Sequence, residues 1–285
     1  MTDLTRRGLA AAVGASLAMA AMGTCIRFAA QDINNAMVVF LRNAFGLMFL
    51  LPGLLQHGTA LMHTQRFTAH LARSLAGLAA MYCFFYAIAH MHLAEAVLLN
   101  FSSPVFTALL AAIWLKEPLS PKTILAVMLG LFGIMLILKP TPTHFTPVSL
   151  VGLASAMLAA VAMVNIRGMA SSEPTWRIVL YFSMISTVVS AIPLGWHWQT
   201  PTPRAWLAMA AAGLCASLGQ LMLTYSYTSA PAAKVGTINY STVIFAGLLG
   251  WWLWNERPDQ LSLLGASLVI AAGILVAKRP PAEAD

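Results

Sequence analysis

Long apolar stretches separated by short polar segments run along the chain from near its first residue almost to its last. Each stretch is close to the length, roughly 17 to 25 residues, that a helix needs to cross the hydrocarbon core of a bilayer. The segments between them are short and carry the turn-forming prolines. The pattern predicts ten membrane-spanning helices, at residues 8–29, 36–55, 71–90, 93–115, 123–138, 148–166, 178–195, 205–228, 233–254 and 261–277.

The second half of the chain repeats the first. Identical residues recur 139 positions apart, as in the pairs Tyr86 and Tyr225, Asn100 and Asn239, and Glu117 and Glu256. The pair Ile26-Arg27 meets Ile166-Arg167 at a distance of 140. Each copy holds five predicted spans, and an odd number of crossings places the second copy upside down in the membrane. We therefore expect an all-α polytopic membrane protein built from two inverted five-helix repeats, residues 1–140 and 141–285.

Composition agrees with a membrane location. Of the 285 residues, 59% are hydrophobic and only 9% are charged, which is too little polar surface to coat a soluble globule of this size. None of the gaps between the predicted spans is long enough for a soluble domain. The lipid bilayer is therefore the expected surrounding of nearly the whole chain.

The net charge of +7 indicates sidedness rather than a nucleic-acid partner. If the N-terminus is cytoplasmic, most cations fall on the cytoplasmic side, namely Arg6, Arg7, Arg66, Arg73, Lys116, Lys122, Arg167, Arg177, Lys234, Lys278 and Arg279. The positive-inside rule then places both termini in the cytoplasm of a bacterial-type inner membrane. The arginine pair near the N-terminus resembles a secretory signal. We expect the first span to be retained, because the repeat pairs it with the span that begins at residue 148.

Three ionisable side chains at or near membrane depth are candidates for gating or coupling. Arg42 lies about a turn and a half into the second span, and Arg27 and Glu95 approach the same level from the outer side. Charges at this depth are costly, so each is a functional candidate. The three could form one network at the outer mouth, or they could be interfacial structural charges. Inversion places Arg167 and Lys234 at the corresponding positions of the inner mouth, where Lys234 could serve orientation alone.

Polar side chains at helical spacing form a second set of candidates. Residues three, four or eight apart share one face of a helix. The candidates for contact with a solute at mid-depth are Tyr82, Tyr86, Asn100, Ser103, Gln220, Tyr225, Asn239 and Tyr240. Such groups replace part of a solute's hydration in a carrier, although hydroxyls and amides also bond their own helix or join neighbouring helices.

Pro104 lies in the middle of the span predicted at 93–115. Proline has no backbone N–H, so it frees a carbonyl and permits a bend. Its partner in the second repeat is Val243, so the predicted kink occurs in one half alone.

Signatures of enzymes and metal sites are not found in the sequence. There is no G-x-S-x-G, no H-E-x-x-H and no Walker lysine, and the three cysteines show no C-x-x-C spacing. The histidines are scattered along the ends of spans. We therefore expect no catalytic residues, no metal and no cofactor.

Several segments carry a family resemblance. Leu93-Ala94-Glu95-Ala96, Ser103-Pro104-Val105-Phe106, Glu117-Pro118 and Lys139-Pro140 resemble the repeat of EamA-type transporters in the drug/metabolite transporter superfamily, and Asn255-Glu256-Arg257-Pro258 resembles its second copy. The resemblance spans the whole chain. It implies a central cavity between the two halves, and relatives that export amino acids and other metabolites or import compounds such as S-adenosylmethionine or riboflavin.

These observations together predict a secondary transporter that moves a small organic metabolite by alternating access. Export of an amino acid or a related amphipathic solute is favoured. The alternatives are an uptake permease for a metabolite such as S-adenosylmethionine or riboflavin, and a solute channel. The chain is expected to act as a monomer or a homodimer, with a small molecule and the bilayer as its partners and without nucleic acid.

Overall fold

The computed structural model describes residues 3–57, 63–114, 121–138, 146–169, 172–229 and 238–277. Across these ranges the regular secondary structure is helical, with no strands. The helices are α1 (Asp3–Ala29), α2 (Asn35–His57), α3 (Phe67–His90), α4 (Leu93–Asn100), α5 (Ser103–Trp114), α6 (Pro121–Leu138), α7 (Pro147–Met169), α8 (Thr175–Ala191), α9 (Leu194–His197), α10 (Pro203–Ser229), α12 (Ser241–Trp254) and α13 (Gln260–Ala277).

Each predicted span overlaps a described helix or two consecutive ones, although the span expected at 233–254 is described only from residue 238 and contains α12 from Ser241. The span expected at 93–115 is divided into α4 and α5, and the one expected at 178–195 is continued beyond α8 by the short α9. Helix α3 begins at Phe67, four residues before the expected start. Of the described helices, five are long and apolar enough to cross a membrane by length and composition, at Arg7–Ala29, Asn35–Pro52, Phe67–His90, Pro147–Ile166 and Pro203–Leu223.

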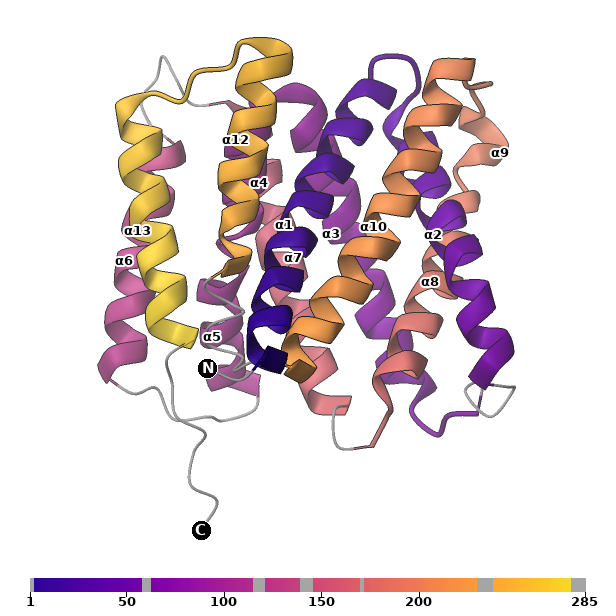
Figure 1. Cartoon of the computed structure of the whole chain (residues 1–285), viewed down its shortest axis with the longest axis horizontal. Helices are drawn as coiled ribbons and strands as arrows, with labels where there is room; N and C mark the ends of the chain where they lie inside the picture. The colour runs from indigo at the N-terminus through magenta and orange to yellow at the C-terminus, as the bar shows by residue number, and fades with distance from the viewer. Residues whose placement is uncertain are drawn as a thin grey trace.

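The helices lie roughly side by side in one bundle (Figure 1). Helices α1 and α10 pack along each other, as do α3 and α7, and α6 packs against α13 at one edge of the bundle. Helices α1 and α13 run in opposite directions, so that α1 begins and α13 ends at the same end of the bundle (Figure 1). We call this end the N-terminal face and the opposite end the distal face.

Small residues allow the closest of these pairs to form. A Cβ atom added at Gly14 of α1 would lie 3.0 Å from the sulfur of Met222 on α10, and one added at Gly219 would lie 2.9 Å from the Met19 side chain of α1. On each of the two helices, a glycine thus leaves space for a methionine side chain of the other helix. Close approach of this kind stabilises helix pairs in lipid, where helix association gains little from the hydrophobic effect. The same contact brings the thiols of Cys25 and Cys215 together.

The packing has a regular relation to the sequence repeat. Helices α1 and α7 occupy matching positions in the two copies, and so do α3 and α10. Exchanging each helix for its match turns the α1–α10 pair into the α7–α3 pair, and both pairs are present. The α2–α10 and α8–α3 contacts are exchanged in the same way. Matching helices α6 and α13 pack on each other, as do α2 and α8.

Candidate functional site

Two helix interruptions lie part-way through the bundle. Helix α4 ends at Asn100 and α5 begins at Ser103, while α12 begins at Ser241 directly after Tyr240. A continuous helix through 93–115 would need a hydrogen bond from residue 104 to the carbonyl of Asn100, and proline has no N–H to donate. Pro104 is instead the second residue of α5, where the missing N–H leaves no intrahelical bond unmade. The expected mid-span bend is therefore a complete break just before Pro104.

Polar groups close the backbone at the first interruption. The Ser102 hydroxyl donates to the Leu99 carbonyl at 2.5 Å, and its own carbonyl accepts from the Val105 amide at 3.0 Å. The side-chain amide of Asn100 donates to the Ser155 hydroxyl of α7 at 3.1 Å. The Ser103 carbonyl accepts from Thr107. Asn100 thus joins two helices, which is the packing alternative for this residue, and it does so beside the break.

The second interruption touches the first. Tyr240 is buried, and its ring centroid lies 5.8 Å from that of Phe101, between α4 and α5. The Ser16 hydroxyl of α1 donates to the Ile238 carbonyl at 3.4 Å. Of the eight expected solute contacts, the structure therefore gathers four around the two breaks, namely Asn100, Ser103, Asn239 and Tyr240.

The other four expected contacts lie elsewhere on α3 and α10. The Tyr86 ring stacks on His90 with ring centroids 4.1 Å apart, and Tyr86 is partly exposed. Tyr225 and Gln220 are exposed on α10. Tyr82 is half-buried, and its backbone carbonyl accepts from Asn35 of α2. These four remain predicted solute contacts.

An ion pair joins helix ends at the distal face. Arg27, at the end of α1, lies 2.5 Å from a carboxylate oxygen of Glu256, which follows α12. The second carboxylate oxygen accepts from the Leu93 amide at 2.9 Å and so caps α4. Arg27 also donates to the Met91 carbonyl at 3.2 Å and lies 4.6 Å above the Trp254 ring. One arginine and one glutamate thereby tie α1, α4 and α12 together.

The end of α12 explains how Glu256 reaches this position. Asn255 has a left-handed backbone with φ of 55°, and the Glu256 amide donates back to the Gly250 carbonyl at 3.2 Å. Turns of this kind end helices and reverse the chain direction. A Cβ atom at Gly250 would lie 2.8 Å from the Glu256 carboxylate, so glycine leaves the space that this side chain needs.

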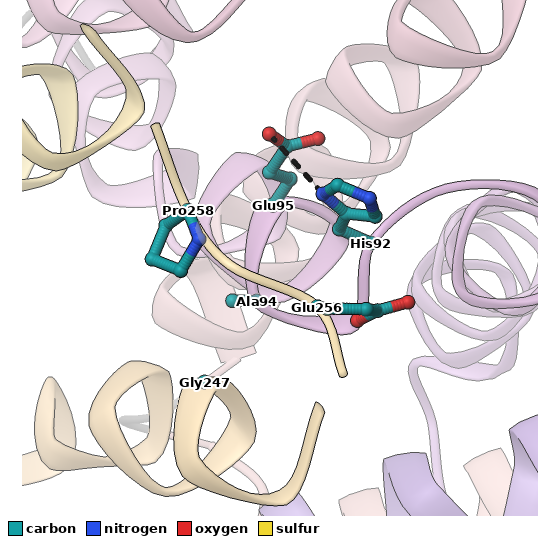
Figure 2. A pocket seen from close by; sticks show the side chains of 6 residues that line it. All are labelled: His92, Ala94, Glu95, Gly247, Glu256 and Pro258. Atoms are coloured by element: carbon teal, nitrogen blue, oxygen red, sulfur yellow. Dashed lines mark ion pairs between the residues drawn. The ribbon is translucent and has the colours of Figure 1, made fainter. Parts of the chain in front are cut away.

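Glu95 borders a shallow recess beside the ion pair. Figure 2 shows the segment with Glu256 and Pro258 passing over α4, and the Glu256 carboxylate turned away from Glu95. Glu95 lies 3.8 Å from His92 and accepts from the Ser262 hydroxyl of α13 at 3.1 Å. The recess has about 220 Å³ of space when open solvent is included, but its enclosed part has room for little more than one water molecule, far less than a small-molecule site. It is therefore too small to hold a solute.

Arg27 and Arg42, two of the three charges expected in an outer network, have different partners in the structure. Arg27 pairs with Glu256, because the turn at Asn255 brings that carboxylate over the end of α1. Arg42 lies on α2 and donates to Asn43 at 3.2 Å. Sequence reasoning placed Glu256 in a loop and missed its role. Its match with Glu117 in the repeat, in a chain with few acids, was the available signal.

A second polar cluster joins α3, α7 and α8 at the N-terminal face. Glu173 accepts from the Thr64 hydroxyl at 2.6 Å and from Arg177 at 2.8 Å, and His70 lies 3.5 Å away. Burial opposes ionisation of Glu173, but the hydrogen bonds from Thr64 and Arg177 and the arginine charge outweigh it and lower the pKa of this carboxyl. Arg66 adds hydrogen bonds to the Gly168 carbonyl and the Ser172 hydroxyl.

The candidates expected at the inner mouth lie outside this description. Arg167 belongs to α7, but its side chain is not among the described ones, and Lys234 lies outside the described residues. The sequence partner of Glu256, Glu117, is also outside them. Within the described part of the chain, no group of three or more histidine, cysteine, aspartate or glutamate side chains could hold a metal ion.

Similarity to known proteins is extensive. A pseudopaline exporter of Pseudomonas aeruginosa is 34% identical over 279 residues, covering 97% of this chain and 98% of the exporter. A riboflavin transporter of Brucella anthropi is 24% identical, covering 94% of this chain and 97% of the transporter. An S-adenosylmethionine uptake transporter of Rickettsia bellii is 24% identical, covering 88% of this chain and 86% of its own length.

Fold similarity extends to solved structures. One crystal structure superposes with a TM-score of 0.60 over 97% of this chain and 98% of its own length, at 21% identity. The model of the EamA-like transporter family matches residues 6–139 and, separately, residues 146–278. The relatives are transporters rather than enzymes, and this chain belongs to the EamA-like transporter family of multi-pass membrane proteins.

Proposed function

We propose that this protein is a secondary exporter of a small organic metabolite. The observation that carries the proposal is the 34% identity to a pseudopaline exporter over 97% of the chain. Secondary transport rather than ATP-driven pumping also agrees with the missing Walker motif in the sequence. An organic solute of the size and polarity of pseudopaline is the first candidate.

The proposed mechanism is alternating access between two inverted halves, residues 1–140 and 141–285. Two findings support it: the family model matches two consecutive segments, and the helix contacts exchange when matching helices are exchanged. The solute would bind at the helix interruptions, because polar side chains gather there at mid-depth. Asn100, Ser103, Asn239 and Tyr240 would contact it there.

We infer that the distal face is closed in this conformation. Arg27 and Glu256 hold α1, α4 and α12 together, so access from that side requires the ion pair to separate. With the termini in the cytoplasm, the distal face would be the outer face of a bacterial-type inner membrane. The structure would then represent an outward-closed state, and release of an exported solute would follow the separation of Arg27 from Glu256.

Flux in proteoliposomes tests the proposal. The purified chain would be reconstituted, loaded in separate preparations with pseudopaline, riboflavin or S-adenosylmethionine, and assayed with and without an imposed pH gradient. We expect saturable pseudopaline flux that empty liposomes lack. Acceleration by the gradient, lost in Glu95→Gln, would identify proton coupling. Flux of riboflavin or S-adenosylmethionine without pseudopaline would instead support the uptake alternative, which the two relatives of those names favour. Single-channel currents would contradict a carrier.

A further inference from the structure

Two arginines inside the bundle extend toward each other from neighbouring helices. Arg42 is on α2 and Arg73 is on α3, and both helices pack against α8. A guanidinium nitrogen of Arg42 lies 3.8 Å from the position that a Cβ atom would take at Gly46, and the corresponding distance from Arg73 to Gly77 is 3.3 Å. Each side chain therefore points toward the C-terminal end of its own helix. Helices α2 and α3 run in opposite directions (Figure 1). Side chains that point along each helix from these positions therefore approach the same level of the bundle.

Several hydrogen-bond donors of this arginine pair are buried without an acceptor. Arg42 uses one terminal nitrogen to donate to the side-chain amide oxygen (Oδ1) of Asn43 at 3.2 Å. Its Nε atom, the Nδ2 atom of Asn43, and the Nε and Nη1 atoms of Arg73 are closed to solvent and make no hydrogen bond in the described part of the chain. Donors of two positive groups and one amide are thus left over, and the two guanidinium groups lie close enough for their charges to interact.

Packing does not account for this arrangement. The Phe182 ring of α8 lies 3.7 Å from the Arg73 guanidinium and covers one of its faces. A ring face, however, accepts no hydrogen bond from the in-plane Nε and Nη1 atoms, which remain unsatisfied. No carboxylate among the described residues forms an ion pair with either arginine. Two like charges at membrane depth without a counter-charge are unfavourable, so the pair favours an anionic partner beyond the described part of the chain.

We propose that Arg42 and Arg73 form a binding site for a carboxylate group of the transported solute. Guanidinium groups present paired donors at the spacing of carboxylate oxygens. The pair lies seven residues into α2 and six residues into α3, within two segments apolar enough to span the membrane, whereas lipid phosphates lie at the interfaces. The assignment of this carboxylate to the transported solute rests on the proposed function. The affinity of the site for a carboxylate is independent of it.

Thermal unfolding with acetate as a minimal carboxylate probe tests the site. The full chain would be placed in nanodiscs of phosphatidylcholine, and its Tm followed in sodium acetate and in sodium chloride of the same ionic strength. A ligand that binds only the folded state raises Tm with a saturable concentration dependence. We expect acetate to raise Tm by about 3 °C or more above chloride. An equal Tm in both salts overturns the proposal.

Substitutions assign the effect to the two side chains. Arg42→Gln and Arg73→Gln are expected to abolish the acetate response, and Arg42→Lys to retain part of it. Neither glutamine variant should lower Tm in chloride, because each removes an unpaired buried charge, so the variants should fold. Arg257→Gln, on the exposed segment after α12, is the matched control and should respond as the natural chain does. An unchanged acetate response in both glutamine variants overturns the assignment.

Two further measurements of Tm identify the source of the anion. In one, the nanodiscs contain phosphatidylglycerol and no acetate is added. In the other, inorganic phosphate takes the place of acetate in the buffer. Stabilisation by either of these without stabilisation by acetate overturns the proposal. Pseudopaline flux in proteoliposomes then links the site to transport: both glutamine variants should raise its KM at least tenfold. If no flux of any solute is found while acetate binding persists, the proposed function fails and the carboxylate site stands.

Discussion

The rings of Phe101 and Tyr240 lie 5.8 Å apart, and the two residues occupy equivalent positions in the sequence repeat. Two residues related by a twofold axis contact each other only when they lie near that axis. The contact therefore supports an axis between the proposed halves that passes through the interruptions before α5 and α12. The inferred twofold axis therefore passes through the candidate solute site.

A double-mutant cycle tests the contact between Phe101 and Tyr240. Aromatic pairs contribute about 0.5–1.5 kcal/mol beyond the area that they bury, so Phe101→Ala and Tyr240→Ala should show a coupling of about 1 kcal/mol in unfolding free energy. Unfolding in mixed micelles with a denaturing detergent measures it. The combination of Phe101→Ala with Tyr225→Ala serves as the control and should be additive. Additive losses for Phe101 and Tyr240 would contradict their direct interaction.

Opening of the distal face should depend on the ion pair between Arg27 and Glu256. Arg27→Gln leaves the partly buried Glu256 without its counter-charge, so the closed state loses stability. A cysteine placed at Ala94, in the recess of Figure 2, should then react with a membrane-impermeant maleimide at least about fivefold faster than in the parent chain.

Two variants check the interpretation of this labelling. A cysteine at the exposed Arg257 should react at equal rates with and without Arg27→Gln. The charge exchange Arg27→Glu with Glu256→Arg should slow the labelling of residue 94 again. Fast labelling that persists in the exchanged protein would show that the charge pair does not control access.

Acid should weaken the junction of α3, α7 and α8 through Glu173. Because its pKa is lowered in the folded protein, the stabilisation from this carboxylate is complete above its pKa in the unfolded chain, at about pH 4 to 5. It is lost as the pH falls through the lower folded pKa. The Tm difference between the natural chain and Glu173→Gln should therefore be constant from about pH 6 to 8 and shrink in acid.

Arg177→Gln provides the companion measurement. Without the arginine charge, the pKa of Glu173 in the folded protein rises toward its ordinary value. The Tm difference between Glu173 and glutamine at this position should therefore be smaller, and it should disappear at a higher pH. A Tm difference that does not change with pH in the presence of Arg177 would contradict the assigned ionisation.

Two glycines allow a matched test of helix packing. A Cβ atom at Gly133 of α6 would lie 2.8 Å from the Gly265 carbonyl oxygen of α13, so Gly133→Ala forces the helices apart and should cost about 1–3 kcal/mol. At Gly168 of α7 a Cβ atom would meet nothing within 4 Å. Gly168→Ala should be neutral or stabilise by up to about 1 kcal/mol, because alanine favours helix. Equal effects of the two substitutions would show that close approach does not limit the α6–α13 contact.

Much of the fold could be predicted because a helix surrounded by lipid needs a long apolar segment, and such segments are visible in the sequence. Each of the ten apolar ranges overlaps a helix or helix pair in the described part of the chain, and the family resemblance is confirmed by the matched segments. The site was less predictable. Arg73 was counted as a cation at the membrane surface, because the start of its helix was expected four residues too late. An error of one helical turn is enough to move a charge from the interface into the span.

The repeat, the apolar composition and the motifs around Glu117 and Glu256 were sufficient to indicate an EamA-type membrane transporter, because chain-wide patterns survive small errors in helix boundaries. The partners of individual charges required the tertiary structure. The turn at Asn255 places Glu256 over Arg27, and the opposed directions of α2 and α3 bring Arg42 toward Arg73. Such pairings depend on distances of a few ångströms between helices far apart in the sequence, and periodicity along one chain contains no information about them.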